Sequence, residues 1–190
     1  HQEVHPDVVG YLSFAKQDLF AFDPKSASEA WASPRSWVDV SDALWHPDFD
    51  AAPDYERKAE IAGSVGDGMA AKFMEHRRSA GRLPNPESIL DGSVTTIDKE
   101  LKNEVSAMTS LVVGLSYEIH NIYKRDGIKG DFKKFFNNTV RFAYSNFQPE
   151  QVILFFKTIM KDYKIRFNIR TDLDKDLYKV FSERYTKYIV

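Results

Sequence analysis

The sequence predicts a mainly α-helical protein, and three features of the 190 residues support this fold class. Apolar residues recur three or four positions apart over most of the chain, which is the spacing of one helix face. Proline stands where a first helical turn would begin at Pro6, Pro34 and Pro149, a position where the N–H that it lacks would be unpaired anyway. Only residues 163–169 alternate apolar and polar side chains, so one short β element is expected there.

The first half contains four predicted helices separated by Gly, Pro and Asp. Pro6 begins the first helix, and Asp23-Pro24 ends the stretch that follows it. Ser33 is the expected N-cap of the second helix, whose apolar stripe consists of Trp37, Val40, Leu44 and Trp45. A loop at residues 46–53, a short helix at 54–63, a break at 66–68 and a helix at 69–76 follow in order. Gly81 and Pro84 end the last of these helices.

The second half is predicted to be helical as well. After a connector at residues 85–95, a long helix is expected from about residue 97 to 123. Its inner face would carry Leu101, Val105, Met108, Val112, Leu115 and Ile119. A turn at residues 126–130 precedes helical stretches at 131–146, 149–163 and 172–188. The last stretch has an apolar stripe that would pack internally or against a neighbouring subunit, formed by Tyr178, Phe181, Tyr185 and Tyr188.

The composition is that of a folded globular protein. Apolar residues make up 43% of the chain, and 14 Phe, 9 Tyr and 3 Trp supply material for a core. The absence of Cys excludes disulfides and thiolate metal sites and fits a reducing compartment. No apolar run approaches the roughly 20 residues that are needed to span a bilayer. The sequence therefore predicts a protein of the cytoplasm without a membrane segment.

The charge differs between the two halves, although the net charge of the whole chain is only −2. Residues 1–95 hold 16 acidic and 9 basic side chains, a net charge of −7, whereas residues 96–190 hold 12 acidic and 17 basic ones, a net charge of +5. A shift of this kind favours two functional regions. The bounds that we give them, residues 1–92 and 93–190, are those that the resemblance described below implies.

The segment Ser33-Pro34-Arg35 is the strongest candidate for a functional site. Ser33 as N-cap and Pro34 as first helical residue would fix the start of a helix, so that Arg35 extends from its first turn. A guanidinium held in that way can make paired hydrogen bonds to a phosphate. An ordinary exposed arginine beside a helix cap is the alternative interpretation of these three residues.

Five segments together resemble the small lid subdomain of MoxR-like AAA+ ATPases. Residues 5–12 (HPDVVGYL) resemble its opening helix, and residues 20–24 (FAFDP) and 32–37 (ASPRSW) follow in the order of the family. Residues 63–73 (GSVGDGMAAKF) and 83–90 (LPNPESIL) resemble its next segments. Order and spacing carry the resemblance, which covers residues 5–92 and fades beyond them.

The resemblance implies a function for the whole parent protein. Arg35 matches the sensor-2 arginine, which reaches from the lid to the γ-phosphate of ATP, with Ser33 and Pro34 setting the helix start beside it. The parent would bind ATP and Mg²⁺ and would assemble as a ring, which we expect to be a hexamer. It would use ATP hydrolysis to remodel a partner protein, with the lid passing movement to the neighbouring subunit. Residues 93–190 would be a helical extension that serves partner binding or oligomerisation.

This chain departs from the family in one large respect. It contains no G-x-x-x-x-G-K-[ST] motif and no apolar strand that ends in Asp-Glu, so it lacks the groups that hold the triphosphate and Mg²⁺. The upstream α/β domain of the ATPase would supply them. The chain begins with His1 rather than Met, and we expect it to be a fragment that is inactive alone.

Two other patterns are interpreted as structural. Gly63, Gly66 and Gly68 lack a preceding strand and a following Lys-Ser/Thr pair, so they predict a helix junction rather than a phosphate loop. The histidines form no H-x-x-x-H or H-x-E pair, and His46 with Asp48 and Asp50 indicates a loop with solvated charges. No metal site is predicted.

Two rival functions stay open. A stand-alone helical protein-interaction module would make Arg35 a dispensable surface residue. A nucleic-acid-binding helical domain would use the basic and aromatic residues between 130 and 170, because cations and stacking rings are what a single strand needs. The basic residues are Lys133, Lys134, Arg141, Lys157, Lys161, Lys164, Arg166 and Arg170, interleaved with Phe135, Phe136, Phe142, Tyr144, Phe155 and Phe156. The helical spacing of the rings favours a core instead.

Overall fold

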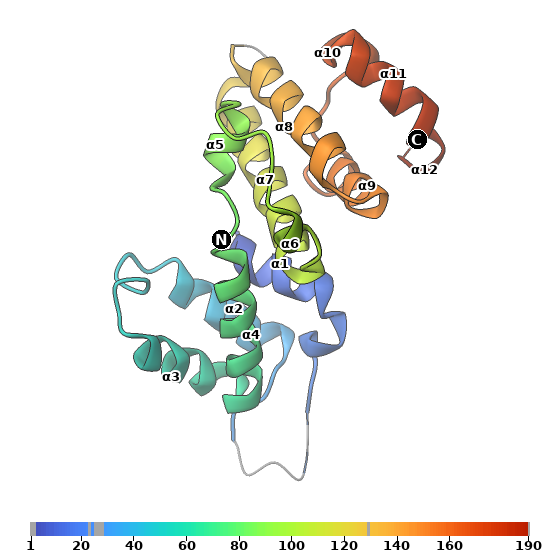
Figure 1. Ribbon diagram of the computed structural model, residues 1–190. Helices are drawn as coiled ribbons and strands as arrows, with labels where there is room; N and C mark the ends of the chain where they lie inside the picture. The colour runs from blue at the N-terminus through green and yellow to red at the C-terminus, as the bar shows by residue number, and fades with distance from the viewer. Residues whose placement is uncertain (1–2, 23, 25–28, 129, 190) are drawn as a thin grey trace. The chain divides into compact units, whose positions relative to one another are not determined.

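A computed structural model of the chain describes residues 3–22, 24, 29–128 and 130–189. It divides into two compact units, His1–Gly81 and Arg82–Val190 (Figure 1). The sequence analysis places the boundary near residue 92 instead. The difference arises from Ile89 and Leu90, which follow the break at Gly81 and are buried in the core of the second unit.

The first unit is built from helices α1 (Pro6–Phe14), α2 (Pro34–Leu44), α3 (Asp54–Val65) and α4 (Asp67–Ala80), with the 3₁₀ turn η1 (Lys16–Leu19) after α1. Its core centres on three rings. Trp37 lies 5.4 Å from Tyr11 and 5.4 Å from Phe73, and Tyr11 lies 5.5 Å from Phe73. These contacts bring α1, α2 and α4 together, and α3 packs against α2 and α4.

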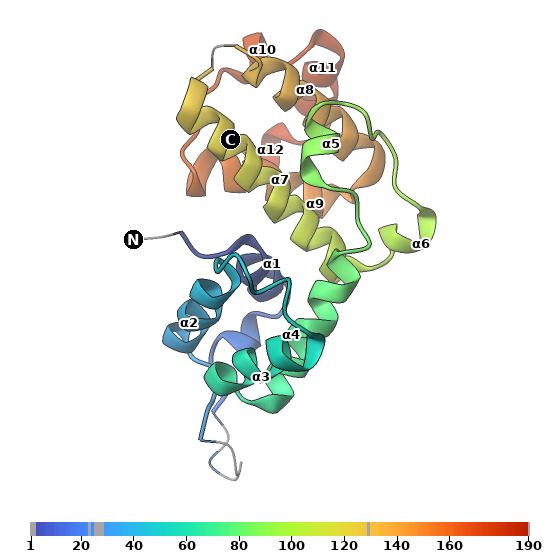
Figure 2. The same cartoon turned by 90° about the vertical axis from the view of Figure 1, so that its left-hand side faces the viewer.

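The second unit is built around helices α7 (Val105–Asp126), α8 (Phe132–Asn146) and α9 (Pro149–Lys157), which pack against one another (Figure 2). Further helices complete it: α5 (Pro86–Leu90), α6 (Lys99–Lys102), α10 (Ile169–Asp172), α11 (Lys175–Arg184) and α12 (Thr186–Ile189). A π-helical turn, η2 (Thr158–Asp162), continues α9. The core of the second unit is rich in Phe, with Phe132, Phe136, Phe155 and Phe156 fully buried.

The predicted fold class, mainly α, is confirmed, and so are the main helix starts. Pro6, Pro34 and Pro149 all stand in the first turn of their helices, and Ser33 is the N-cap of α2. The predicted stripe on α2 is correct for Trp37, Val40 and Leu44, which are buried. The predicted end of the first stretch at Asp23-Pro24 falls partly outside the described residues, which omit Asp23.

Several element predictions are wrong, including the single helix at residues 172–188, which is divided into α11 and α12. The long helix is divided into α6 and α7, because Glu104 has non-helical backbone angles (φ −81°, ψ 82°). Val105, just after this division, is 57% exposed and does not belong to the inner face. The connector at residues 85–95 contains α5, for which Asn85 provides the cap by accepting a 3.0 Å hydrogen bond from the N–H of Glu87.

The expected β element at residues 163–169 is also absent. Across the described residues the structure contains no strand, and its one β-type pairing is an isolated antiparallel bridge between Ala21 and Ala32. Residues 165–168 form no regular element, and Lys164 before them has a positive φ of 53°. A strand needs a neighbour to satisfy its backbone, and no neighbouring strand is available to this segment.

The stripe on the last helices packs mainly inside the unit. Tyr185 stacks on Tyr144 with 5.5 Å between the ring centres, and Phe181 lies 4.9 Å from Phe156. Tyr188 at the end of the stripe is 50% exposed. None of the helices described is both long enough and apolar enough to cross a membrane.

Candidate functional site

The start of α2 is held by a reciprocal pair of serines. Ser33 Oγ accepts a hydrogen bond from the N–H of Ser36 at 3.2 Å, and Ser36 Oγ accepts one from the N–H of Ser33 at 2.8 Å. Ser36 Oγ also lies 3.0 Å from the carbonyl oxygen of Trp31, to which it donates. These bonds satisfy N–H groups that a helix start leaves unpaired. Pro34, at the first helical position, has no backbone N–H that would need a partner. The first turn is therefore fixed locally by the sequence itself.

Trp37 fixes the same helix to the rest of the first unit. Its ring is 2% exposed, and its indole Nε1 donates a 2.9 Å hydrogen bond to the backbone carbonyl of Asp18. Since Trp37 lies two residues after Arg35, the position of the first turn of α2 follows from the core. The backbone from which the Arg35 side chain extends therefore has a fixed position, although the side chain itself is long.

Arg35 is exposed and available for a ligand. Within the described residues its guanidinium has no ion pair and no hydrogen bond, although Asp39 stands one helical turn further on. Arg77 of α4 differs sharply. Its side chain is 15% exposed, its Nε lies 2.7 Å from Asp7 Oδ2, and a terminal nitrogen lies 3.1 Å from Asp50 Oδ1. Arg77 is a structural arginine, whereas Arg35 has no internal role.

The polar groups beneath α2 are structural. The Tyr11 hydroxyl donates a 2.5 Å hydrogen bond to Asp18 Oδ2, and Lys72 Nζ lies 3.6 Å from Asp18 Oδ1. Burial and the hydrogen bond to Asp18 raise the pKa of the Tyr11 hydroxyl. Tyr11 therefore stays neutral at physiological pH and serves as a fixed donor rather than as a base.

An exposed aromatic cluster precedes α2, and the sequence analysis did not identify it. Phe20 and Phe22 are 63% and 59% exposed, and both rings make edge contacts with Trp31 at 5.1 and 5.3 Å. The bridge between Ala21 and Ala32 holds the two chain segments together, with a 3.0 Å bond from the N–H of Ala21 to the carbonyl of Ala32. The alternation of aromatic and small side chains in Phe20-Ala21-Phe22 is the sequence feature from which this cluster could have been predicted.

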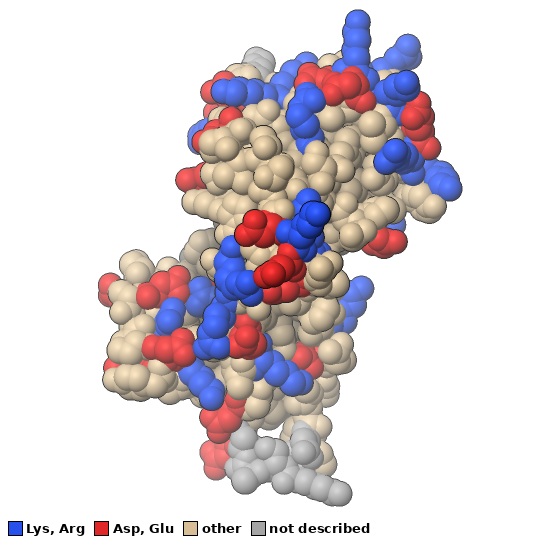
Figure 3. All heavy atoms as spheres, viewed as in Figure 1, with Lys and Arg blue, Asp and Glu red and all other residues tan. Residues whose placement is uncertain are grey.

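The surface of the first unit carries both signs of charge. Figure 3 shows the acidic and basic side chains of α3 and α4 interspersed on the face that it presents. Arg57 lies 3.1 Å from Asp54, and Arg78 lies 3.7 Å from Asp54. Exposed pairs of this kind contribute little stability, but they leave no large region of one sign on this face.

The glycine and histidine motifs lie at a helix junction and at an exposed turn. Gly63 lies inside α3 and Gly68 inside α4, while Gly66 forms the junction between the two helices with a positive φ of 86°. The break is thus one residue long and shorter than predicted. His46 and Asp48 are exposed at a turn, with 3.9 Å between Nδ1 and the carboxylate. The described residues hold no group of three or more side chains placed to bind a metal.

The rings of the second half are unsuitable for stacking on nucleic-acid bases. Phe136, Phe142, Phe155 and Phe156 are buried, as the helical spacing indicates, and Phe135 and Tyr144 are partly buried against the same core.

Two of the cations proposed for nucleic-acid binding are also neutralised. Lys133 Nζ lies 2.8 Å from Asp172, and Arg141 contacts Asp174 and Asp176 at 2.9 and 2.8 Å. A single-strand site of exposed rings and free cations is therefore not present on α8.

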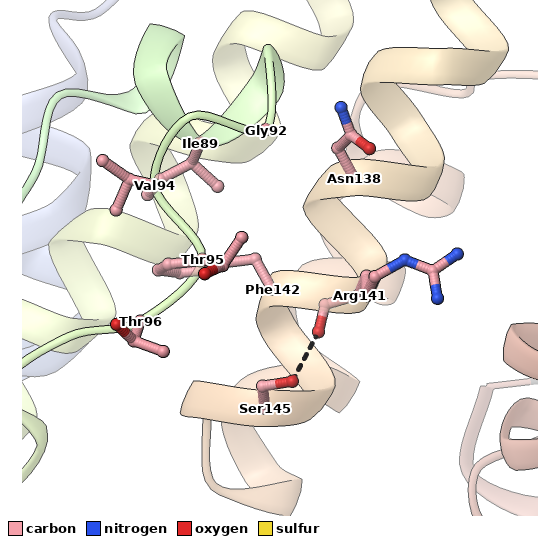
Figure 4. A pocket seen from close by; sticks show the side chains of 9 residues that line it. All are labelled: Ile89, Gly92, Val94, Thr95, Thr96, Asn138, Arg141, Phe142 and Ser145. Carbon is pink, nitrogen blue, oxygen red and sulfur yellow. Dashed lines mark hydrogen bonds between the residues drawn. The ribbon is translucent and has the colours of Figure 1, made fainter.

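A pocket of about 260 Å³ lies between α8 and the connector that follows α5 (Figure 4). Apolar side chains such as Ile89, Val94 and Phe142 line it together with polar ones such as Thr95 and Asn138. In Figure 4 the guanidinium of Arg141 points away from the connector, as its ion pairs require. The lining therefore offers no free cation, and the pocket could not be predicted from the sequence because its two sides come from separate elements.

Comparison of the chain with protein-family models, with curated proteins and with solved structures gave no match. The likeness to an AAA+ lid therefore rests on the residues of the chain alone.

Proposed function

We propose that this chain is the C-terminal lid and extension of a MoxR-like AAA+ ATPase, with Arg35 as the contact to the γ-phosphate of ATP. The observation that carries the proposal is the state of Arg35. It extends from the doubly capped first turn of α2, the helix that Trp37 anchors, and has no partner among the described residues. A cation presented in this way suits transfer of a phosphoryl group, which is catalysed by positioning and by stabilisation of charge.

The residues present fit only one part of an ATP site. Arg35 would supply a charged donor to the phosphate, and Ser33 and Pro34 would hold the turn from which it extends. The sequence has no Walker A or Walker B motif, so ATP and Mg²⁺ would be held by an upstream α/β domain of the parent protein. The chain alone would not hydrolyse ATP.

The parent would act as a ring, in our proposal a hexamer in the cytoplasm, that remodels a partner protein. Closure of the lid over ATP would bring Arg35 to the phosphate, and the coupling of α2 to the rest of the first unit through Trp37 would transmit that movement. Residues from 93 onward would bind the partner protein or a neighbouring subunit.

The first test is the sequence of the coding region upstream of His1. The proposal requires a strand followed by G-x-x-x-x-G-K-[ST], within roughly 200 residues of His1. A start codon immediately before His1 would exclude the ATPase function for this polypeptide.

The second test uses the full-length gene product. Replacing Arg35 by Ala should lower kcat for ATP hydrolysis by roughly 10²-fold, the usual effect of removing one charge-stabilising donor, with a smaller change in KM. Arg35→Lys should recover only part of the activity, since it loses the paired geometry. The matched control is Arg184→Ala, another exposed arginine, which should leave kcat unchanged.

The exposed cluster of Phe20, Phe22 and Trp31 favours the rival function, a helical protein-interaction module. In that case Arg35→Ala would leave the full-length protein unaltered, whereas Phe20→Ser with Phe22→Ser would abolish association with the partner. The two sets of variants therefore separate the two functions.

A further inference from the structure

The segment between η2 and α10 leaves backbone groups unpaired among the described residues. The N–H of Ile165 donates a 2.9 Å bond to the carbonyl of Ile159, and the N–H of Asn168 donates a 2.7 Å bond to Asp172 Oδ2. Between these two anchors, Arg166 has neither its N–H nor its carbonyl paired within the described part of the chain. In a strand, one residue presents both groups to the same neighbour, so Arg166 offers the donor and acceptor of an open strand edge.

Side chains in this segment alternate between the core and the solvent. Ile165 is 4% exposed, and the Phe167 ring lies 4.7 Å from Phe136 in the core. Arg166 and Asn168 are exposed, and Asn168 has extended backbone angles (φ −98°, ψ 105°). This alternation is the reason that the sequence predicts a strand here. The segment has the side-chain pattern of a strand, and at Arg166 its backbone has no partner among the described residues.

The same stretch carries an uncompensated positive charge. Residues 157–170 contain five basic side chains and one acidic one, Asp162. The basic strip consists of Lys157, Lys161, Lys164, Arg166 and Arg170, all exposed and all without an ion pair among the described residues. Elsewhere in the unit, Lys133 and Arg141 are neutralised by aspartates. The basic strip therefore places five cations without an ion pair in the stretch that contains the open edge.

We propose that the open edge at Arg166 binds an acidic, extended polypeptide segment of a partner protein, which adds to it as a β-strand. Backbone hydrogen bonds would supply the affinity that is common to all strand addition. The basic strip would give specificity for a peptide that carries carboxylates. Nucleic acid suits the edge less well. A phosphodiester backbone accepts hydrogen bonds but cannot donate to the Arg166 carbonyl, and the neighbouring ring of Phe167 is packed on the core. The inference does not depend on Arg35 or on ATP.

Fluorescence anisotropy on the full chain tests this inference with three labelled probes. The first is a short peptide of alternating Glu and Val, and the second is the same peptide with N-methyl groups on the backbone nitrogens of one edge. The third is single-stranded oligothymidine. The acidic peptide should bind, and N-methylation should weaken its binding at least about tenfold, because it removes the donors that strand addition needs.

Two variants connect binding to the edge. Arg166→Glu should weaken binding of the acidic peptide at least about tenfold through repulsion of like charges. Lys179→Glu makes the same charge change at an exposed site on α11 and should leave binding nearly unchanged. Circular dichroism verifies that both variants keep their helices.

Three results would overturn the inference. Equal affinity for the methylated and unmethylated peptides would show that backbone pairing plays no part. Equal losses in Arg166→Glu and Lys179→Glu would show general charge attraction instead of a site at the edge. Tighter binding of oligothymidine than of the acidic peptide would identify nucleic acid as the ligand.

Discussion

The indole Nε1 of Trp37 donates a 2.9 Å hydrogen bond to the backbone carbonyl of Asp18, inside the core of the first unit. The bond joins α2, whose first turn carries Arg35, to the turn that follows α1. The Asp18 side chain is itself held by the Tyr11 hydroxyl. A single buried indole therefore positions the candidate phosphate contact relative to two other elements.

Replacing Trp37 by Phe should destabilise the first unit by about 1–3 kcal/mol, because the buried Asp18 carbonyl loses its donor while most of the ring packing remains. Urea unfolding followed by tryptophan fluorescence measures the change. This signal reports the first unit alone, since all three tryptophans, Trp31, Trp37 and Trp45, lie there.

Trp45→Phe is the control for this variant. The Trp45 indole also donates a 2.9 Å bond to a carbonyl, that of Glu3, but at an exposed site. Its loss should cost less than about 1 kcal/mol, because water can replace the donor. Equal destabilisation by the two variants would contradict the anchoring role of Trp37.

Asn146 at the end of α8 holds the connector before α6. Its Oδ1 accepts a 3.2 Å bond from the N–H of Ile97, and its Nδ2 donates 2.9 Å bonds to the carbonyls of Thr95 and Phe142. Asn146→Ala should lower the free energy of unfolding of the second unit by about 1–3 kcal/mol, since the buried Ile97 N–H loses its acceptor. Thermal unfolding followed by circular dichroism at a helix wavelength checks this. Asn103→Ala, at an exposed amide, should change it by less than about 0.5 kcal/mol.

Features that depend only on neighbouring residues are well predicted from the sequence. The cap of α2 at Ser33 and Pro34 is local, because its hydrogen bonds join residues three positions apart. The same holds for the proline starts of α1 and α9. A pattern within one turn of helix contains all the information that such a start needs.

Features that depend on distant residues were missed. The division between α6 and α7 lies close to a connector that Asn146 fixes from another helix, and nothing in residues 97–123 signals it. The alternation at residues 163–169 correctly indicates which side chains face the core, but it cannot supply a neighbouring strand. Helical or extended periodicity describes one segment, whereas pairing and breaks depend on what that segment packs against.

The candidate site shows the same limit. The sequence indicates that Arg35 lies on the first turn of a helix, and this is confirmed. It could not show that Asp39, one turn away, forms no ion pair with Arg35, because exposed side chains choose among several rotamers. Nor could it show the aromatic cluster, since Phe20 and Trp31 meet only through a backbone bridge.

Gly92 has a backbone conformation that would be strained for any residue with a side chain. Its φ is +87°, and a Cβ there would lie 3.0 Å from Asn138 Nδ2, which is held by a 2.9 Å bond to the Leu90 carbonyl. Gly92→Ala should therefore destabilise the second unit by about 1–3 kcal/mol. Gly63→Ala is the opposite case, because Gly63 lies inside α3 with no atom within 4 Å of the new Cβ. It should stabilise the first unit by about 0.5–1 kcal/mol, and urea unfolding monitored by circular dichroism measures both.

Acid should destabilise the first unit through the buried His76 and the partly buried His5. Burial lowers the pKa of His76 below its ordinary value of 6.5, against the opposing effect of the Asp7 carboxylate. Burial also lowers the pKa of His5, with Asp7 opposing and Arg77 adding to the decrease. As the pH falls through 6.5, the unfolded chain takes up protons that the folded chain does not bind. Stability therefore decreases, by at most about 1.4 kcal/mol per pH unit for each proton.

His76→Gln removes one of these protons and should reduce the slope of stability against pH between about pH 7.5 and 5.5. Urea unfolding followed by tryptophan fluorescence at several pH values gives that slope. His46→Gln is the matched control, because His46 has a side chain that is 67% exposed. A slope that His76→Gln leaves unchanged, or a first unit that becomes more stable as the pH falls, would contradict the assignment. The slope matters more than the stability at any one pH, because the substitution itself alters packing beside Tyr11, whose ring lies 5.3 Å from that of His76.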